Sequence, residues 1–160
     1  TPSGTKATAI LAHISNAQAS IETSHLTDYP KYLRKDERLI DVFARLTTYT
    51  HYMLVNGSQE SVARGSALLG IDTSVFTEIV TSEIVGETKP STKGFTYIMQ
   101  KTGLSADSHV MIGDREMVDL APAKAVGMRT CLVSWGLTHP QTDCVDSTIE
   151  DIYTVPKLFL

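Results

Sequence analysis

Two carboxylates follow a short apolar run in the second half of the chain. Val110-Met111-Ile112 leads into Gly113 and Asp114, and Asp119 lies five positions after Asp114. Carboxylate oxygens are hard ligands, and Mg²⁺ takes few of them from a protein because it keeps several water or substrate oxygens. The pattern therefore predicts a Mg²⁺ site at Asp114 and Asp119. The alternative is that Asp114 caps the following helix and that Asp119 is a solvated helix residue.

A lysine stands before a proline upstream of these carboxylates, at Lys89-Pro90. An isolated lysine is usually a solvated surface charge. Proline is favoured in the first turn of a helix, so Pro90 predicts a helix that begins at Ser91 with Lys89 at its entrance. From that place a lysine can neutralise a phosphate group. Both interpretations of Lys89 remain open at this point.

A polar turn, Asn56-Gly57-Ser58, follows the apolar segment Tyr52–Val55. Asn and Ser cap helices and Asn-Gly favours turns, so a simple turn with a helix cap explains these residues. In an open parallel sheet, however, ligands bind beyond the carboxyl ends of the strands. The turn is therefore also a candidate ligand-binding segment.

The elements that must position these residues alternate between strand and helix. Strands are predicted at Tyr52–Val55, Phe76–Thr81, His109–Ile112 and Arg129–Val133, and helices at Gln59–Leu69, Ser91–Lys101 and Met117–Ala125. Gly70 and Gly127 stand where helix C-caps are expected. Such alternation predicts parallel βαβ units in an α/β sheet.

The residues before Thr47 predict helices and loops. Apolar residues recur at intervals of three and four from Lys6 to Glu22, which predicts one face of an amphipathic helix. A second helix is predicted from Asp36 to Leu46, with Asp36 as its N-cap.

The order of the motifs is more specific than any single motif. Lys89-Pro90, then GDREMVD, then AKAVGMRTCLVSWG follow the strand with Asn56-Gly57. The segment Tyr52–Gly136 thereby resembles the core of the haloacid dehalogenase superfamily, whose members are mostly Mg²⁺-dependent phosphatases. The resemblance implies a Rossmann-like α/β core with a parallel sheet and an N-terminal helical cap remnant.

The resemblance also implies roles for individual residues. In the family, an aspartate at the end of the first strand attacks phosphorus and forms an aspartyl-phosphate, and a second aspartate handles the leaving-group proton. Matched to this sequence, Lys89 is the catalytic lysine and also binds phosphate, Asn56-Gly57-Ser58 binds phosphate, and Asp114 and Asp119 hold Mg²⁺. A lysine and Mg²⁺ neutralise the charge that phosphoryl transfer develops.

Two features depart from the family pattern. Val55 stands where a Thr or Ser normally precedes the Asn of the second motif, and no Asp-x-Asp-Gly-Thr run, which would carry the nucleophile, occurs in the sequence. We therefore expect a helical cap remnant at residues 1–35 and a core at residues 36–160 that lacks its first strand. Because that strand is central in the family's sheet, two strand edges are expected to lack a partner. The 160-residue chain by itself is expected to be weakly active or inactive.

The amino-acid composition argues against nucleic acid and membranes as partners. The formal net charge is −4, with 42% hydrophobic and 20% charged residues, which is typical of a globular protein that does not bind nucleic acid. No apolar stretch approaches the ~20 residues of a membrane helix, so we expect a cytoplasmic protein without a membrane partner. Cys131 and Cys144 are expected to be free thiols. The oligomeric state is not predicted.

Three functions remain open. The first is a phosphomonoesterase that acts on a small phosphorylated metabolite, such as a nucleotide monophosphate or a phosphoglycolate-like compound. The second is a catalytically silent relative that binds a phosphorylated ligand or a partner protein through Lys89, Asp114 and Asp119. The third is a different α/β module, such as a flavodoxin-like receiver, although that fold would not require Lys-Pro before GDxxxxD. Trp135, the single tryptophan, either lines a pocket mouth or packs inside the protein.

Overall fold

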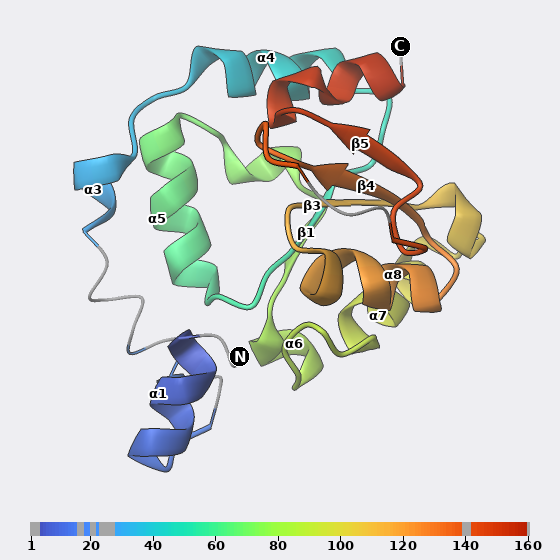
Figure 1. Ribbon diagram of the computed structural model, residues 1–160. Coiled ribbons are helices and arrows are strands. Elements are labelled where there is room, and N and C mark those ends of the chain that lie inside the picture. The colour runs from blue at the N-terminus through green and yellow to red at the C-terminus, as the bar shows by residue number, and fades with distance from the viewer. Residues whose placement is uncertain (1–3, 16–17, 20–21, 23–27, 139–141, 160) are drawn as a thin grey trace. The chain divides into compact units, whose positions relative to one another are not determined.

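The structure is a computed structural model, and it describes residues 4–15, 18–19, 22, 28–138 and 142–159 (Figure 1). The chain divides into two compact units. The first unit comprises Thr1–Ile40 and Tyr49–Thr88, and the second comprises Asp41–Thr48 and Lys89–Leu160. The boundary expected between residues 35 and 36 remains a prediction.

The first unit contains a two-stranded parallel sheet. Strand β1 (Tyr52–Leu54) pairs with β2 (Glu78–Val80), and helix α5 (Gln59–Leu69) lies between them in the sequence. Helix α1 (Gly4–Ala12) and three short helical segments also belong to this unit: α3 (Tyr29–Tyr32), η1 (Thr73–Val75) and α6 (Ser82–Val85). The predicted strands and the predicted helix Gln59–Leu69 are therefore confirmed, with shorter strands.

Helix α5 has the limits that its local sequence predicts. The Ser58 hydroxyl accepts a hydrogen bond from Ser61 N–H at 3.2 Å, which caps the first turn. Gly70 ends the helix with φ of +77°, a left-handed conformation that glycine adopts without steric cost.

The predicted helix from Lys6 to Glu22 is wrong as a single element. Helix α1 (Gly4–Ala12) ends early, and His13 has φ of +54°, which breaks the helical path. Ile10 and Leu11 are exposed, so the apolar spacing does not bury a face at these residues. The later residues of the predicted helix lie partly outside the described residues.

The second unit contains three parallel strands in the order β3-β4-β5. They are β3 (Val110–Gly113), β4 (Arg129–Val133) and β5 (Ser147–Ile149). The helical segments are α7 (Lys93–Thr102), η2 (Ala106–Ser108), the π-helical turn η3 (Glu116–Leu120), α8 (Ala121–Ala125) and the 3₁₀ segment η4 (Ile152–Leu158). In Figure 1, η4 lies on one side of these strands, and α7 and α8 lie on the other. The alternation predicted for this half is confirmed.

The main apolar core belongs to the second unit. It contains the buried side chains of Val42, Leu46, Cys131, Val133, Ile149 and Val155. Val42 comes from helix α4 (Glu37–Arg45), and Asp36 caps this helix as predicted, accepting from the N–H groups of Arg38 and Leu39 at 3.1 Å. Cys131 and Cys144 are both free, and burial raises the pKa of the Cys131 thiol.

In the described residues, β4 alone pairs on both sides, and each of the other four strands pairs on one side only. Within the described residues, β1 pairs only with β2, and β3 pairs only with β4. The strands and helices thus form a parallel α/β core, while the expectation of two unpaired edges around a missing first strand remains a prediction.

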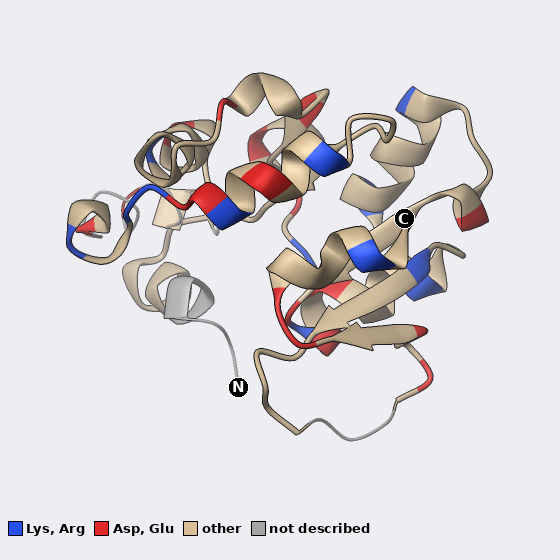
Figure 2. Cartoon of the chain, turned by 90° about the horizontal axis from the view of Figure 1, so that it is seen from above, with Lys and Arg blue, Asp and Glu red and all other residues tan. Residues whose placement is uncertain are grey.

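Charges of both signs are distributed along the described surface. Figure 2 shows residues of both charges along the chain. In α4, Glu37, Arg38, Asp41 and Arg45 alternate in sign. No helix in the described ranges is long and apolar enough to cross a membrane.

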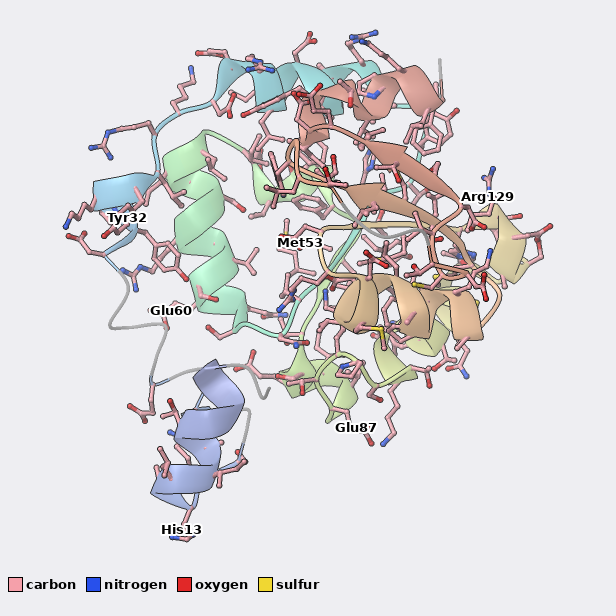
Figure 3. The ribbon with its side chains drawn as sticks, viewed as in Figure 1. His13, Tyr32, Met53, Glu60, Glu87 and Arg129 are labelled. Carbon is pink, nitrogen blue, oxygen red and sulfur yellow. The ribbon has the colours of Figure 1, made fainter. Side chains whose placement is uncertain are left out.

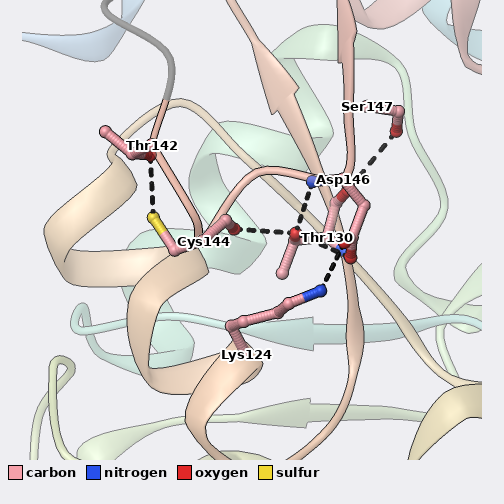
Figure 4. A network of polar contacts seen from close by, with 6 residues as sticks. All are labelled: Lys124, Thr130, Thr142, Cys144, Asp146 and Ser147. Carbon is pink, nitrogen blue, oxygen red and sulfur yellow. Dashed lines mark hydrogen bonds and ion pairs between the residues drawn. The ribbon is translucent and has the colours of Figure 1, made fainter.

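A polar network joins β4 to the segment that leads into β5 (Figure 4). Thr130 N–H donates to Asp146 Oδ2 at 2.9 Å, and the Thr130 hydroxyl donates to the carbonyl of Cys144 at 2.8 Å. Lys124 forms an ion pair with Asp146. The hydrogen bond from Lys124 lowers the pKa of Asp146, and the bonds from Thr130 act in the same direction.

Asp146→Asn is expected to lower the free energy of unfolding at pH 7 by about 1 kcal/mol, because solvent screens the partly exposed carboxylate. The pKa of Asp146 is lower in the folded than in the unfolded state, so its contribution is present above about pH 4. The contribution is lost as pH falls through the folded-state pKa. Urea unfolding at pH 7 and at about pH 3 measures the difference between wild type and variant, which is expected to shrink at the lower pH.

Asp143→Asn is the matched control, since it removes the same charge from a nearby exposed position. It is expected to leave the free energy of unfolding unchanged at both pH values. Equal effects of the two substitutions would contradict a structural role for the Asp146 network.

Candidate active site

Lys89 and Asp119 form a buried ion pair within the second unit. Lys89 Nζ lies 2.5 Å from Asp119 Oδ1, and the two side chains are only 8% and 3% exposed. The interpretations of Lys89 as a surface charge and of Asp119 as a solvated helix residue are therefore wrong. Two opposite charges that are withdrawn from water together compensate part of each other's desolvation cost.

The prediction that Pro90 starts a helix is also wrong. Helix α7 begins at Lys93, after a turn at residues 89–90 and a bend at residues 91–92, with a cis peptide bond between Lys89 and Pro90. Lys89 is thus placed by a turn and by its contact with Asp119, not by a helix entrance.

Gly113 and the π-helical turn η3 bring Asp119 into position. A Cβ atom on Gly113 would lie 2.7 Å from Asp119 Cβ, closer than carbon atoms approach each other, so only glycine leaves this space. In η3, Asp119 N–H donates to the Arg115 carbonyl and Ala121 N–H donates to the Glu116 carbonyl. The second bond spans five residues and defines the π-helical turn, a local widening that is frequent at functional sites. The predicted α-helix Met117–Ala125 is therefore a π-helical turn followed by α8.

Arg115 links the two carboxylates of the motif. Its Nε lies 3.4 Å from Asp119 Oδ2 and 3.9 Å from Asp114 Oδ1. The sequence prediction did not include Arg115, although its spacing of four residues to Asp119 is that of a helical ion pair. The Asp114 side chain is 56% exposed, and η3 has no side-chain cap bond, so the capping interpretation of Asp114 finds no support.

The donor set fits a magnesium ion. Asp119 Oδ1 is buried and has no hydrogen bond of acceptable geometry within the described residues, although Lys89 Nζ approaches it at ion-pair distance. Asp114 adds a second, solvent-accessible carboxylate on the same arginine. No group of three or more His, Cys, Asp or Glu side chains suited to a metal occurs in the described part of the chain. Mg²⁺ needs only one or two carboxylates, because water and substrate phosphate supply its remaining ligands.

The turn Asn56-Gly57-Ser58 lies in the first unit, after β1. Ser58 is buried and caps α5, so its structural interpretation is confirmed, whereas phosphate binding by this turn remains a prediction. Gln59 N–H donates to Glu83 Oε2 at 3.5 Å, which places a carboxylate at the end of the helix where anions bind. The structure thus brings together Lys89, Asp114 and Asp119 within one unit, while the polar turn belongs to the other.

The comparisons agree with this architecture. Residues 17–133 match the family model described as haloacid dehalogenase-like hydrolase. The glyceraldehyde 3-phosphate phosphatase of Methanocaldococcus jannaschii is 36% identical over 83 residues, which cover 52% of this chain and 35% of that protein. The phosphoglycolate phosphatase of Aliivibrio fischeri is 27% identical over 81 residues, or 49% of this chain and 35% of that one. The match therefore spans about a third of the length of these curated relatives.

Solved structures show the same fold. A phosphatase of this superfamily from Thermococcus onnurineus superposes with a TM-score of 0.65 at 25% identity, covering 74% of this chain and 55% of that one. A 2-haloacid dehalogenase from Pseudomonas syringae gives a TM-score of 0.65 at 21% identity, over 76% and 51% of the two chains. With the matched model covering most of its length, this chain belongs to the haloacid dehalogenase-like hydrolase family.

Proposed function

We propose that the protein containing this chain is a Mg²⁺-dependent phosphomonoester hydrolase that acts on a small phosphorylated metabolite. The reaction would pass through an aspartyl-phosphate, although the sequence contains no Asp-x-Asp-Gly-Thr run for the nucleophile. The observation that carries the proposal is the buried Lys89–Asp119 ion pair beside the exposed carboxylate of Asp114. The similarity to two phosphatases supports the same reaction class.

The charges of these residues suit phosphoryl transfer. Lys89 is a buried cation whose position is set by Asp119, so it can stabilise negative charge on phosphoryl oxygens with little reorganisation. Asp114 and Asp119 would hold Mg²⁺, which when bound polarises the phosphoryl group and neutralises its charge. Asn56, Gly57 and Ser58 are proposed to donate hydrogen bonds to phosphate oxygens from the turn after β1.

The names of the relatives suggest a general class of substrate. Their names specify glyceraldehyde 3-phosphate and phosphoglycolate, both small phosphate monoesters. We propose a small metabolite of this kind or a nucleotide monophosphate for the present protein. Its net charge of −4 favours such a partner over nucleic acid.

Lys89→Ala is expected to lower Mg²⁺-dependent phosphate release from p-nitrophenyl phosphate by at least about 100-fold, because a positioned cation is removed from the developing charge. Asp114→Asn is expected to raise the Mg²⁺ concentration needed for half-maximal release. The assay uses the full-length protein, whose intact mass also shows whether a further segment accompanies the 160 residues.

Asp107→Asn serves as the control, since it neutralises an exposed carboxylate of the same unit and is expected to leave release unchanged. If the full-length protein binds Mg²⁺ but releases no phosphate, the catalytic proposal fails. A silent relative that binds a phosphorylated ligand would then be the better account.

A further inference from the structure

Trp135 adopts a backbone conformation that is unusual for a bulky residue. Its φ is +54°, in the left-handed region that normally takes glycine or asparagine. Gly136 follows with φ of +74°, and Leu137 N–H donates to the Ser134 carbonyl at 2.9 Å. This hydrogen bond encloses two consecutive left-handed residues, which is the geometry of a tight turn that strongly prefers Asn and Gly. A tryptophan here raises the free energy of the folded state.

The indole is also exposed. The residue is 54% accessible, so the interpretation of Trp135 as a packing residue is wrong. Burying an aromatic ring would offset the strained backbone, but this ring stays largely in water. Neither local preference nor core packing therefore explains why tryptophan occupies this turn. Strained residues that folding does not explain are concentrated at functional sites.

The turn lies at the end of the sheet where the carboxyl ends of the strands meet, and Asp114 lies at the same end. Gly113 of β3 is in register with Leu132 of β4, so Asp114 and the turn after Val133 follow the carboxyl ends of neighbouring strands. Arg129 marks the opposite, amino-terminal end of β4 in Figure 3. Ser134 N–H donates to the Ile149 carbonyl at 2.9 Å, which fixes the base of the turn to β5. Ligands bind at this end of an open parallel sheet.

We propose that Trp135 is a specificity-determining residue that contacts the organic part of a phosphomonoester. The inference rests on the proposed function, in which the phosphoryl group is bound beside Lys89 and Asp119. An indole carries no charge with which to bind the phosphoryl group. Its flat apolar face instead suits a planar leaving group. The ring thus favours phosphate esters of aromatic or heterocyclic groups over esters of small hydroxy acids.

Trp135→Asn separates this role from a structural one. Asparagine tolerates the left-handed conformation, so the variant is expected to unfold at the same temperature as wild type or a few degrees higher. In the full-length protein, its ratio of kcat/KM for p-nitrophenyl phosphate to kcat/KM for 2-phosphoglycolate is expected to fall about tenfold. Trp135→Phe retains an aromatic face and is expected to keep most of the wild-type ratio.

Leu104→Asn is the control, because it removes another exposed apolar side chain of the same unit, located before β3 rather than after it. It is expected to leave the ratio unchanged. An unchanged ratio in Trp135→Asn, with phosphate release intact, overturns the inference and leaves the proposed function standing.

Fluorescence tests the contact without turnover. Trp135 is the single tryptophan of the 160 residues, and the emission that the full-length protein loses in Trp135→Phe comes from this residue. Phenyl phosphate is expected to change the emission saturably, and inorganic phosphate at the same concentrations is expected to change it less. If the full-length protein releases no phosphate, the proposed function fails and this titration decides the inference. Emission that does not respond to phenyl phosphate would then overturn it.

Discussion

Asp119→Asn is expected to lower the free energy of unfolding by about 3 kcal/mol, because it leaves the buried ammonium of Lys89 without its counter-charge. Arg115, whose Nε is 3.4 Å from Asp119 Oδ2, loses an ion-pair partner at the same time. Urea unfolding at neutral pH measures the loss, with the slope of the transition checked for two-state behaviour.

Asp114→Asn is the matched control within the same motif. It makes the same chemical change on a carboxylate that contacts the same arginine but is 56% exposed. Exposed ion pairs contribute little, so its effect on the free energy of unfolding is expected to stay below about 0.5 kcal/mol. Equal losses for the two variants would mean that the Lys89–Asp119 pair is not buried in solution.

A double variant tests whether Asp119→Asn destabilises the protein because Lys89 is left as an unpaired buried charge. Lys89→Met combined with Asp119→Leu replaces the pair by apolar side chains of similar size, and such replacements are often neutral for stability. The double variant is therefore expected to recover most of the stability that Asp119→Asn loses. The double variant is nevertheless expected to release no phosphate, because both proposed functional groups are gone.

Gly113→Ala is expected to have the second largest effect on the free energy of unfolding. The new Cβ would lie 2.7 Å from Asp119 Cβ, which is the base of that side chain and not a flexible end. Either β3 or η3 must shift, at a cost of about 2 kcal/mol in the free energy of unfolding. A displacement of about 1 Å at a catalytic group lowers activity by roughly 100-fold, so kcat/KM is expected to fall by this order.

Gly65→Ala provides the matched control in α5. There the new Cβ would meet only Leu33 Cδ1 at 3.8 Å, an ordinary van der Waals distance. Alanine inside a helix is favoured over glycine, so this variant is expected to gain about 0.5 to 1 kcal/mol. If both substitutions shift the unfolding midpoint in the same direction, close packing of Gly113 against Asp119 is not the cause.

The candidate site places two cations beside its carboxylates. Lys89 and Arg115 both contact Asp119, and Arg115 also approaches Asp114. A metal ion at these carboxylates would take over part of the role that Arg115 has in the structure. Mg²⁺ binding is thus expected to be coupled to the position of this exposed arginine side chain.

Elements whose limits depend on neighbouring residues were predictable from the sequence. Ser58 and Gly70 delimit α5, and Asp36 caps α4, because capping satisfies backbone groups within one turn. Strand β4 was predictable with its observed limits, since the short apolar run Cys131-Leu132-Val133 is typical of a strand covered on both faces. The order of Lys89, Asp114 and Asp119 likewise predicted the family, whereas the roles of these residues in a site stay predictions.

Other features depend on groups that are distant in the sequence. Strand β5 was not predicted, because Ser147-Thr148-Ile149 has little apolar pattern, and its pairing with β4 is supported by the contacts between Thr130 and Asp146. The burial of Lys89 depends on Asp119, which lies thirty positions further along the chain.

The sequence by itself thus determined which charged residues this protein carries, in what order, and on which kinds of elements. Only the tertiary structure decided which of them lose contact with water. Burial is a property of packing and not of spacing, so the same lysine and aspartate could have been solvated surface residues. Their mutual compensation inside the second unit is what makes a charged pair stable at that place, and it separates the candidate site from an ordinary charged surface.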